Sequence, residues 1–167
     1  MWQSLSICLS YLMLELQILS FPSPYFGYVD GASRTSLNIA SIGWVIISPT
    51  NDIVSSRGIY LGPSTNTVAE YSFIIKLMTE ASTLGIRHLI VCLDSELVVS
   101  HLNSTYSIFH PILFRKYLRV QLLERSFHFI TYEHIPRQFN SLSNSLANFV
   151  LNWNLLHLKS LHETNIV

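Results

Sequence analysis

The hydrophobic pattern of this chain changes period in an order that few folds accommodate. Three short segments rich in β-branched and aromatic residues come first, and segments with helical spacing then alternate with two more strand-like runs. The predicted strands cover residues 25–30, 39–48, 53–61, 88–93 and 127–135, and the predicted helices cover residues 67–84, 95–102, 112–125 and 141–153. The order βββαβααβα predicts an α/β fold with helices packed on a mixed five-stranded sheet.

These elements fit one domain of residues 24–153, which we expect to be a monomer. Hydrophobic residues make up 49% of the 167, enough to form a core. We expect residues 1–23 to be an apolar leader or linker and residues 154–167 to be a tail, both outside the domain. The leader has Glu15 in its middle, no basic start and no clear cleavage site, so a signal peptide or membrane anchor is the less favoured interpretation.

The location of the protein follows from the same features. Neither Cys8 nor Cys92 has metal-ligand spacing, which is compatible with a reducing compartment. We therefore expect an intracellular protein, in the nucleus or cytoplasm, without stable membrane association.

Acidic side chains stand at three positions that do not suit a buried core. Asp30 and Asp94 stand at the C-terminal ends of apolar strands, where sites of α/β sheets are assembled, and Glu70 lies in the first turn of the first predicted helix. Taken alone, Glu70 is also explained by the helix dipole. If the first and fourth strands are neighbours, the three carboxylates converge on one site.

Four segments with this spacing resemble a known family. They are Tyr28-Val-Asp-Gly-Ala-Ser33, Asn66-Thr-Val-Ala-Glu70, Leu93-Asp-Ser-Glu-Leu-Val-Val99, and His134-Ile-Pro-Arg137 followed by Asn140 and Leu146-Ala-Asn148. Together they resemble the type 1 ribonuclease H domain, most closely the branch attached to reverse transcriptases of plant retroelements. The resemblance implies a ribonuclease H-like fold and hydrolysis of the RNA strand of RNA–DNA hybrids. It also implies that Asp30, Glu70 and Asp94 bind magnesium or manganese, with two ions when substrate is bound.

The chemistry of the three carboxylates agrees with that implication. Magnesium prefers hard oxygen ligands and binds one or two carboxylates together with substrate phosphate. Two such ions activate an attacking water and stabilise the departing oxygen. Without metal, clustered carboxylates repel one another, so the constellation is typical of a site rather than of a structural element.

The chain departs from the family pattern at the fourth metal-binding position. The pattern has an acidic residue two places before the Leu-Ala of the last helix, and here that residue is Asn144. An amide offers a neutral oxygen but no charge. Loss of a unit charge ~4 Å from a cation removes on the order of 4 kcal/mol of attraction at an effective dielectric near 20. We therefore expect Asn144 to weaken metal binding or turnover.

Other candidate residues rest on placement. His134 matches the family's mobile-loop histidine by its spacing of ten residues from Asn144, although a structural role for this imidazole is the favoured interpretation. Possible substrate contacts are Ser33, Asn66, Thr67, Arg137 and Asn140 near the expected site, and Arg115, Lys116 and Arg119 on the predicted helix 112–125. The basic cluster is also explained as a solvated helix face.

Two function classes stay open at this point. Ten basic and ten acidic residues give a net charge of zero, so nucleic-acid binding would depend on local charge or on metal. The first class is a metal-dependent endoribonuclease for RNA–DNA hybrids. The second is a catalytically inactive nucleic-acid-binding relic of a retroelement polyprotein, and either can be a fragment of a longer chain.

Overall fold

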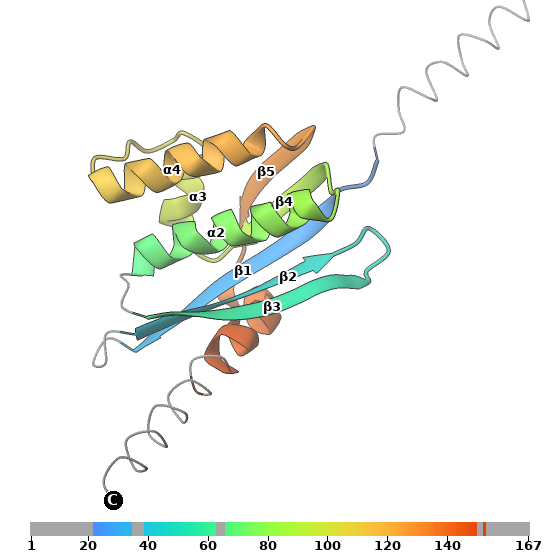
Figure 1. Cartoon of the computed structure of the whole chain (residues 1–167), viewed down its shortest axis with the longest axis horizontal. Coiled ribbons are helices and arrows are strands. Elements are labelled where there is room, and N and C mark those ends of the chain that lie inside the picture. Colours follow the sequence, from blue (N-terminus) through green and yellow to red (C-terminus); the bar gives the residue numbers. More distant parts are fainter. Residues whose placement is uncertain (1–21, 35–38, 63–65, 150–151, 153–167) are drawn as a thin grey trace, which may run out of the picture.

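A five-stranded mixed sheet forms the centre of the molecule (Figure 1). The computed structural model describes residues 22–34, 39–62, 66–149 and 152, except the side chains of residues 33, 34 and 66. The strands are β1 (Tyr25–Arg34), β2 (Ile39–Ile47), β3 (Ile53–Gly62), β4 (His88–Leu93) and β5 (Phe129–His134). The helices are α2 (Asn66–Thr83), α3 (Glu96–Leu102) and α4 (Pro111–Glu124), followed by the 3-10 turn η2 (Arg137–Asn140) and a helix over residues 141–149. The predicted order of elements is therefore confirmed.

The direction of pairing changes at β1. The strand order is β3-β2-β1-β4-β5, with β1, β2 and β3 antiparallel and with β4 parallel to both β1 and β5. Parallel neighbours need a crossover, which α2 supplies between β3 and β4. β1 thus has an antiparallel partner on one side and a parallel partner on the other. Its C-terminal half extends beyond the residues that pair with β4.

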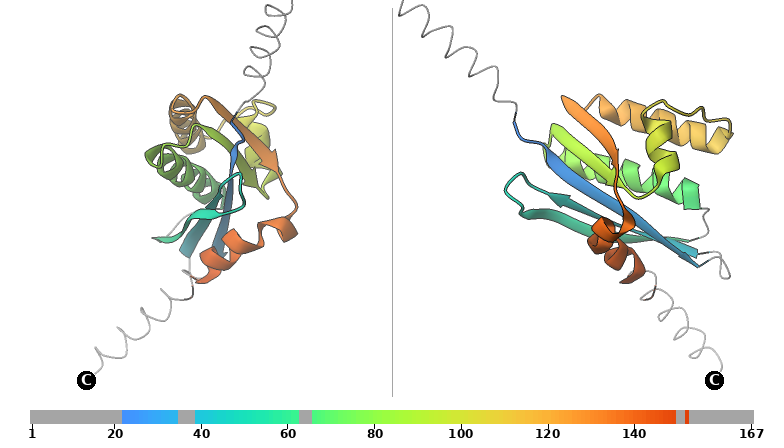
Figure 2. Two further views of the ribbon diagram at one scale, coloured as in Figure 1. Left: turned by 90° about the vertical axis from the view of Figure 1, so that its right-hand side faces the viewer. Right: turned by 180° about the vertical axis from the view of Figure 1, so that it is seen from behind.

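Helices cover both faces of the sheet, but unequally. Helices α2 and α4 lie on one face, while the helix over 141–149 crosses the other face near β1 and β2 (Figure 2). The apolar side of α2, which includes Ile74, Leu77 and Met78, is fully buried against strand residues such as Val29 and Leu89. Burial of each such side chain contributes roughly 1.5–3 kcal/mol, so this layer holds β1 and β4 in place below α2.

The first strand is longer than its sequence predicts. The predicted strand ends at Asp30, before the small residues Gly31, Ala32 and Ser33, but β1 continues to Arg34 because it pairs with β2 as far as Ile39. At Gly31 the ring of Phe73 occupies the space where a side chain would stand. The glycine here permits close helix–strand packing rather than a turn.

The last helix approaches β2 at Gly43. A Cβ atom added to Gly43 would lie 2.7 Å from the backbone nitrogen of Ala147 and would also meet the carbonyl oxygen of Ser143. Ser41 donates a hydrogen bond to the carbonyl of Ala147, and Asn140 Nδ2 donates one to the carbonyl of Val29 at 2.7 Å. These contacts fix the helix over 141–149 beside the carboxyl half of β1.

Gly43→Ala is expected to destabilise the protein by about 2 kcal/mol, because the added methyl group meets helix backbone and not a flexible side chain. Ser56→Ala on the exposed side of β3 is the matched control and should stay within roughly 0.5 kcal/mol. Chemical denaturation of the two variants measures the difference. Equal free energies of unfolding would show that the helix moves away from β2 without cost.

The predicted limits of the domain stay predictions. Most of the leader of residues 1–23 and the whole tail of residues 154–167 lie outside the described residues. Within the part of the chain that the structure describes, no helix is both long enough and apolar enough to cross a membrane.

Candidate active site

Sheet register brings two of the three predicted carboxylates together. The last paired residues of the parallel β1–β4 ladder are Tyr28 and Cys92, and Asp30 and Asp94 each follow two residues later. Because side chains alternate along strands, these two carboxylates lie side by side at the point where the strands diverge. Glu70 reaches the same place from α2. Since α2 begins at Asn66, Glu70 lies beyond the first turn, where the helix dipole no longer explains it.

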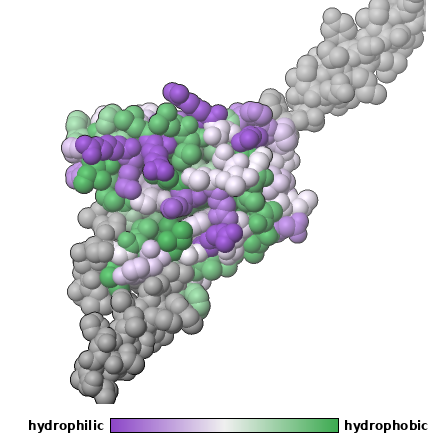
Figure 3. Space-filling model, in the orientation of Figure 1, coloured by the Kyte–Doolittle hydropathy of each residue, from purple (hydrophilic) through white to green (hydrophobic). Residues whose placement is uncertain are grey.

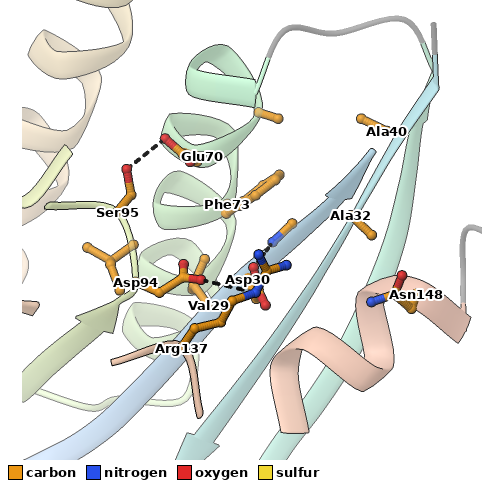
Figure 4. Close-up of a pocket in the computed structure, with 13 residues that line it drawn as sticks. Val29, Asp30, Ala32, Ala40, Glu70, Phe73, Asp94, Ser95, Arg137 and Asn148 are labelled. Carbon is orange, nitrogen blue, oxygen red and sulfur yellow. Dashed lines mark hydrogen bonds and ion pairs between the residues drawn. The ribbon is translucent and has the colours of Figure 1, made fainter. Parts of the chain in front are cut away.

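The three carboxylates line one cavity of about 460 Å³ (Figure 4). Its wall also includes the polar side chains of Ser95, Arg137 and Asn148 and apolar residues such as Phe73. Arg137 reaches into the cavity from η2, and Asn148 faces it from the last helix. The carboxylates from the two strand ends and from the helix thus lie around the same cavity, as the sequence predicts.

Each carboxylate in the cavity has a different set of partners. Glu70 accepts a hydrogen bond from Ser95 Oγ at 3.1 Å, and Asp94 Oδ2 lies 3.9 Å from Arg137 Nε. Asp30 Oδ1 accepts a hydrogen bond from the backbone nitrogen of Gly31 at 2.7 Å. Asp30 Oδ2 is buried and has no hydrogen-bond partner among the described residues. A buried acceptor without a hydrogen bond destabilises the folded state, so a cation or a hydrogen-bond donor at Asp30 Oδ2 would be stabilising.

Burial and like charge raise the proton affinity of this site. Burial, followed by the negative charge of Asp94, raises the pKa of Asp30 to about 6, although the Gly31 N–H and Arg137 oppose the shift. Burial also raises the pKa of Glu70, against the hydrogen bond from Ser95. Both shifts show that the cavity disfavours negative charge when no cation balances it.

The Asp30 carboxylate is therefore expected to destabilise the metal-free protein at neutral pH. Its pKa is raised, so its stabilising contribution is complete below the ordinary value of 3.8 and is lost as pH rises through about 6. Asp30→Asn should raise the free energy of unfolding by on the order of 3 kcal/mol at pH 7.5 and by much less at pH 4. Denaturation in chelator at both pH values measures this. Equal effects at the two pH values would contradict the electrostatic origin.

The carboxylates do not surround a common point as they stand. Among the described residues, no group of three or more His, Cys, Asp or Glu side chains is arranged to hold a metal ion. Glu70 is directed to Ser95, and Asp94 is paired with Arg137 (Figure 4). Binding of a cation between them therefore requires these two side chains to exchange their present partners for the ion.

The amide of the last helix that lines the cavity is not the one that the sequence predicts. Asn148 lines the cavity, whereas Asn144, at the expected fourth position, is not among the cavity-lining residues. Asn144 is half-buried one turn earlier, and both its Oδ1 and its carbonyl oxygen accept hydrogen bonds from Asn148 Nδ2. The two amides form a linked pair beside the carboxylates.

Several other predicted contacts lie in distinct places. Asn140, expected to contact substrate, is 1% exposed, and its amide bonds Val29 and Ser143 instead. It therefore anchors the last helix to β1. His134 ends β5 with an exposed side chain and is not part of the cavity wall, so its catalytic role stays a prediction. Thr67 is half-buried in the first turn of α2, and the side chains of Ser33 and Asn66 lie outside the described part.

The predicted basic cluster on α4 is split by the packing. Lys116 Nζ donates a hydrogen bond to Ser72 Oγ at 2.7 Å, which ties α4 to α2. Burial, with Arg119 nearby, lowers the pKa of Lys116. Arg115 and Arg119 remain exposed to solvent.

Neither Ser95 nor Asn148 was predicted to contribute to the site. Ser95 stands at the N-cap of α3, where serine is common, but its hydroxyl bonds Glu70 rather than the helix backbone. One sequence feature could have indicated Asn148: it is four residues from Asn144, so both lie on one face of a helix.

Comparison with known proteins identifies the kind of domain to which this site belongs. Residues 28–150, which are most of the chain, match the family described as reverse transcriptase-like. The chain belongs to this reverse transcriptase-like family. A ribonuclease HI of Halobacterium salinarum is 35% identical over 124 residues, covering 74% of this chain and 62% of that protein. A bifunctional protein of Mycobacterium tuberculosis is 34% identical over 120 residues, covering 71% of this chain and 33% of that protein.

Solved structures similar to this chain share its fold. The RNase H1 of Halobacterium salinarum has 33% identity and a TM-score of 0.74, covering 78% of this chain and 98% of that one. LC11-RNase H1, solved in complex with an RNA/DNA hybrid, has 26% identity and a TM-score of 0.74, covering 78% and 99%. The predicted type 1 ribonuclease H domain is thereby confirmed. The chain spans less than two thirds of the full length of the two curated relatives described above.

Proposed function

We propose that this reverse transcriptase-like chain is an endonuclease that hydrolyses the RNA strand of RNA–DNA hybrids. The observation that carries the proposal is the convergence of Asp30, Glu70 and Asp94 on one cavity where β1 and β4 diverge. A relative with the same fold, LC11-RNase H1, was solved with an RNA/DNA hybrid. That relationship supports a hybrid as the substrate of this chain.

The donor set fits a divalent cation. The unpaired Oδ2 of Asp30 and the raised pKa values of Asp30 and Glu70 are the features expected of carboxylates that a metal ion balances. Asp30, Glu70 and Asp94 would hold magnesium or manganese, with Asn144 or Asn148 offering a neutral oxygen. Bound metal would activate the attacking water and stabilise the departing sugar oxygen.

The chain's own residues would orient the substrate backbone. Arg137 lies at the mouth of the cavity, where a guanidinium that leaves Asp94 can contact a phosphate in a bidentate manner. Thr67, in the first turn of α2, would contact a 2′-hydroxyl or a phosphate. Such contacts recognise backbone and sugar, so cleavage should show little dependence on base sequence.

A second candidate function follows from the amides of the last helix. Asn144 replaces the acidic residue of the family pattern, and Asn148 in the cavity wall is also neutral. With one charge fewer, the domain would bind nucleic acid without cutting it. This inactive relic is the alternative to the nuclease.

The experiment that separates the two functions follows each strand of a hybrid. The folded protein is incubated in magnesium and then in manganese with hybrids labelled on either the RNA or the DNA strand, and with single-stranded RNA as a control. Internal cuts in the RNA strand alone would support the nuclease. Retention of the hybrid in a binding assay without cuts in either metal would support the relic.

A further inference from the structure

An apolar stripe lies on the solvent side of α4, away from the cavity. Phe114, Leu118 and Leu122 are spaced four residues apart and are 46%, 45% and 59% exposed. Residues at this spacing lie on one helix face, so the three form a continuous surface, here called the α4 outer stripe. Hydrophobic and hydrophilic atoms alternate along the upper edge of the molecule, where α4 lies (Figure 3). Exposed apolar surface of this kind marks an interaction site.

Positive charge borders the stripe. Arg115 and Arg119 flank it, and Arg125 follows the helix at its end. Neither of the two ion pairs found in the described part of the chain involves these arginines. The nearby Glu124 already accepts hydrogen bonds from Tyr132 and Gln121. The stripe thus fits an apolar segment that has an acidic side chain at its edge.

The chain contains such a segment. Residues 1–21, called here the N-terminal segment, lie outside the described residues, and their only charged side chain is Glu15. Large apolar residues recur in it at alternating spacings of three and four, the pattern of a helix that packs on another helix: Trp2, Leu5, Leu9, Leu12, Leu16 and Leu19. A segment of this composition is costly to leave in water.

The point at which the N-terminal segment joins the domain is close to the end of α4. The carbonyl of Pro22 lies 3.2 Å from His88 Nδ1, and the rings of His88 and His128 are 5.7 Å apart. His128 follows α4 by only four residues. In helical geometry the stretch from Cys8 to Pro22 spans about 21 Å, and the 14 residues of α4 span the same length. A helix that leaves Pro22 along α4 therefore places Glu15 beside Leu118 and Arg119.

We propose that the N-terminal segment docks as a helix on the α4 outer stripe, parallel to α4, with Glu15 among the flanking arginines. The stripe and the segment then cover each other's apolar surface. Because the two are joined by one chain, docking benefits from a high effective concentration and needs no partner protein. The apolar centre of the stripe favours this occupant over nucleic acid, which would contact arginines alone.

Crosslinking in the full chain tests the contact. Cys8 is a natural thiol in the segment, and the other cysteine, Cys92, is buried. Arg115→Cys adds a thiol beside the stripe, and Ser56→Cys on the exposed side of the edge strand β3 is the matched control. With a short bismaleimide in dilute protein, the intramolecular crosslink to position 115 should exceed that to position 56 by roughly tenfold. Leu118→Glu in the Arg115→Cys chain should abolish the excess, with circular dichroism confirming the fold.

Four results would overturn the proposal. Equal crosslinking at positions 115 and 56 would show that the segment has no preferred site. Crosslinks that form only between molecules would indicate a second copy as the occupant. Loss of the excess when anionic vesicles are added, with cosedimentation of the protein, would assign the segment to a membrane surface. If Leu118→Glu weakens hybrid binding but leaves the crosslink intact, the stripe is a nucleic-acid contact instead.

Discussion

Asp94→Asn is expected to lower the rate of RNA-strand cleavage by about a thousandfold or more. The side chain keeps its shape but loses a unit charge ~4 Å from the expected cation, which is worth on the order of 4 kcal/mol at an effective dielectric near 20. Asp94 stands beside Asp30 in the cavity wall, so the loss acts directly on metal binding. Initial rates on a labelled hybrid measure the effect. The rise in melting temperature on addition of manganese should disappear in parallel.

Asp52→Asn is the matched control for this change. Asp52 is exposed in the turn between β2 and β3 and accepts a hydrogen bond from Thr50, far from the end of β2 that meets the cavity at Ala40. It should retain the cleavage rate and the response to manganese of the natural chain. A cleavage rate for Asp94→Asn within a few-fold of the control would contradict the assignment of the carboxylate site.

The fold was largely predictable because its pattern is local. Each strand or helix has its own hydrophobic period within a short segment of sequence. These periods identified every strand and α-helix of the described part to within a few residues. The extension of β1 beyond Asp30 was not predictable from Gly31-Ala32-Ser33 alone, since it depends on pairing with β2 as far as Ile39. Small residues signal a turn locally, whereas tertiary packing decides whether they form one.

The candidate site was predictable in its carboxylates but not in their partners. Strand ends indicated Asp30 and Asp94, because acids there are costly without a role. The bond from Ser95 to Glu70 and the pairing of Arg137 with Asp94 depend on how separate elements meet in space. The burial of Asn140 has the same cause. Its sequence position is compatible with an amide that faces either the substrate or β1, and only the packing of the last helix on β1 decides between them. Sequence spacing therefore locates charges better than it assigns neutral polar side chains.

Asn144→Asp is expected to raise metal affinity and the cleavage rate by as much as about a thousandfold. The change restores the charge that the family pattern has two places before Leu146-Ala147, and the attraction regained is on the order of 4 kcal/mol before desolvation and repulsion among the carboxylates. Burial already raises the pKa of Asp30 and Glu70, so a fourth acid should also make the metal-free protein less stable at neutral pH. Titration with manganese and initial rates on a hybrid measure the gain.

Asn148→Asp tests whether a gain in Asn144→Asp comes from a metal ligand at position 144 or only from an added negative charge. Asn148 lines the cavity and donates to Asn144, so an aspartate at 148 brings the same charge to the same helix face one turn later. If the fourth ligand belongs at position 144, Asn144→Asp should increase cleavage far more than Asn148→Asp, although both increase the attraction for manganese. A larger gain from Asn148→Asp would move the fourth ligand to the cavity wall. If neither variant exceeds the natural chain in cleavage while both bind manganese more tightly, charge at this helix does not limit the reaction.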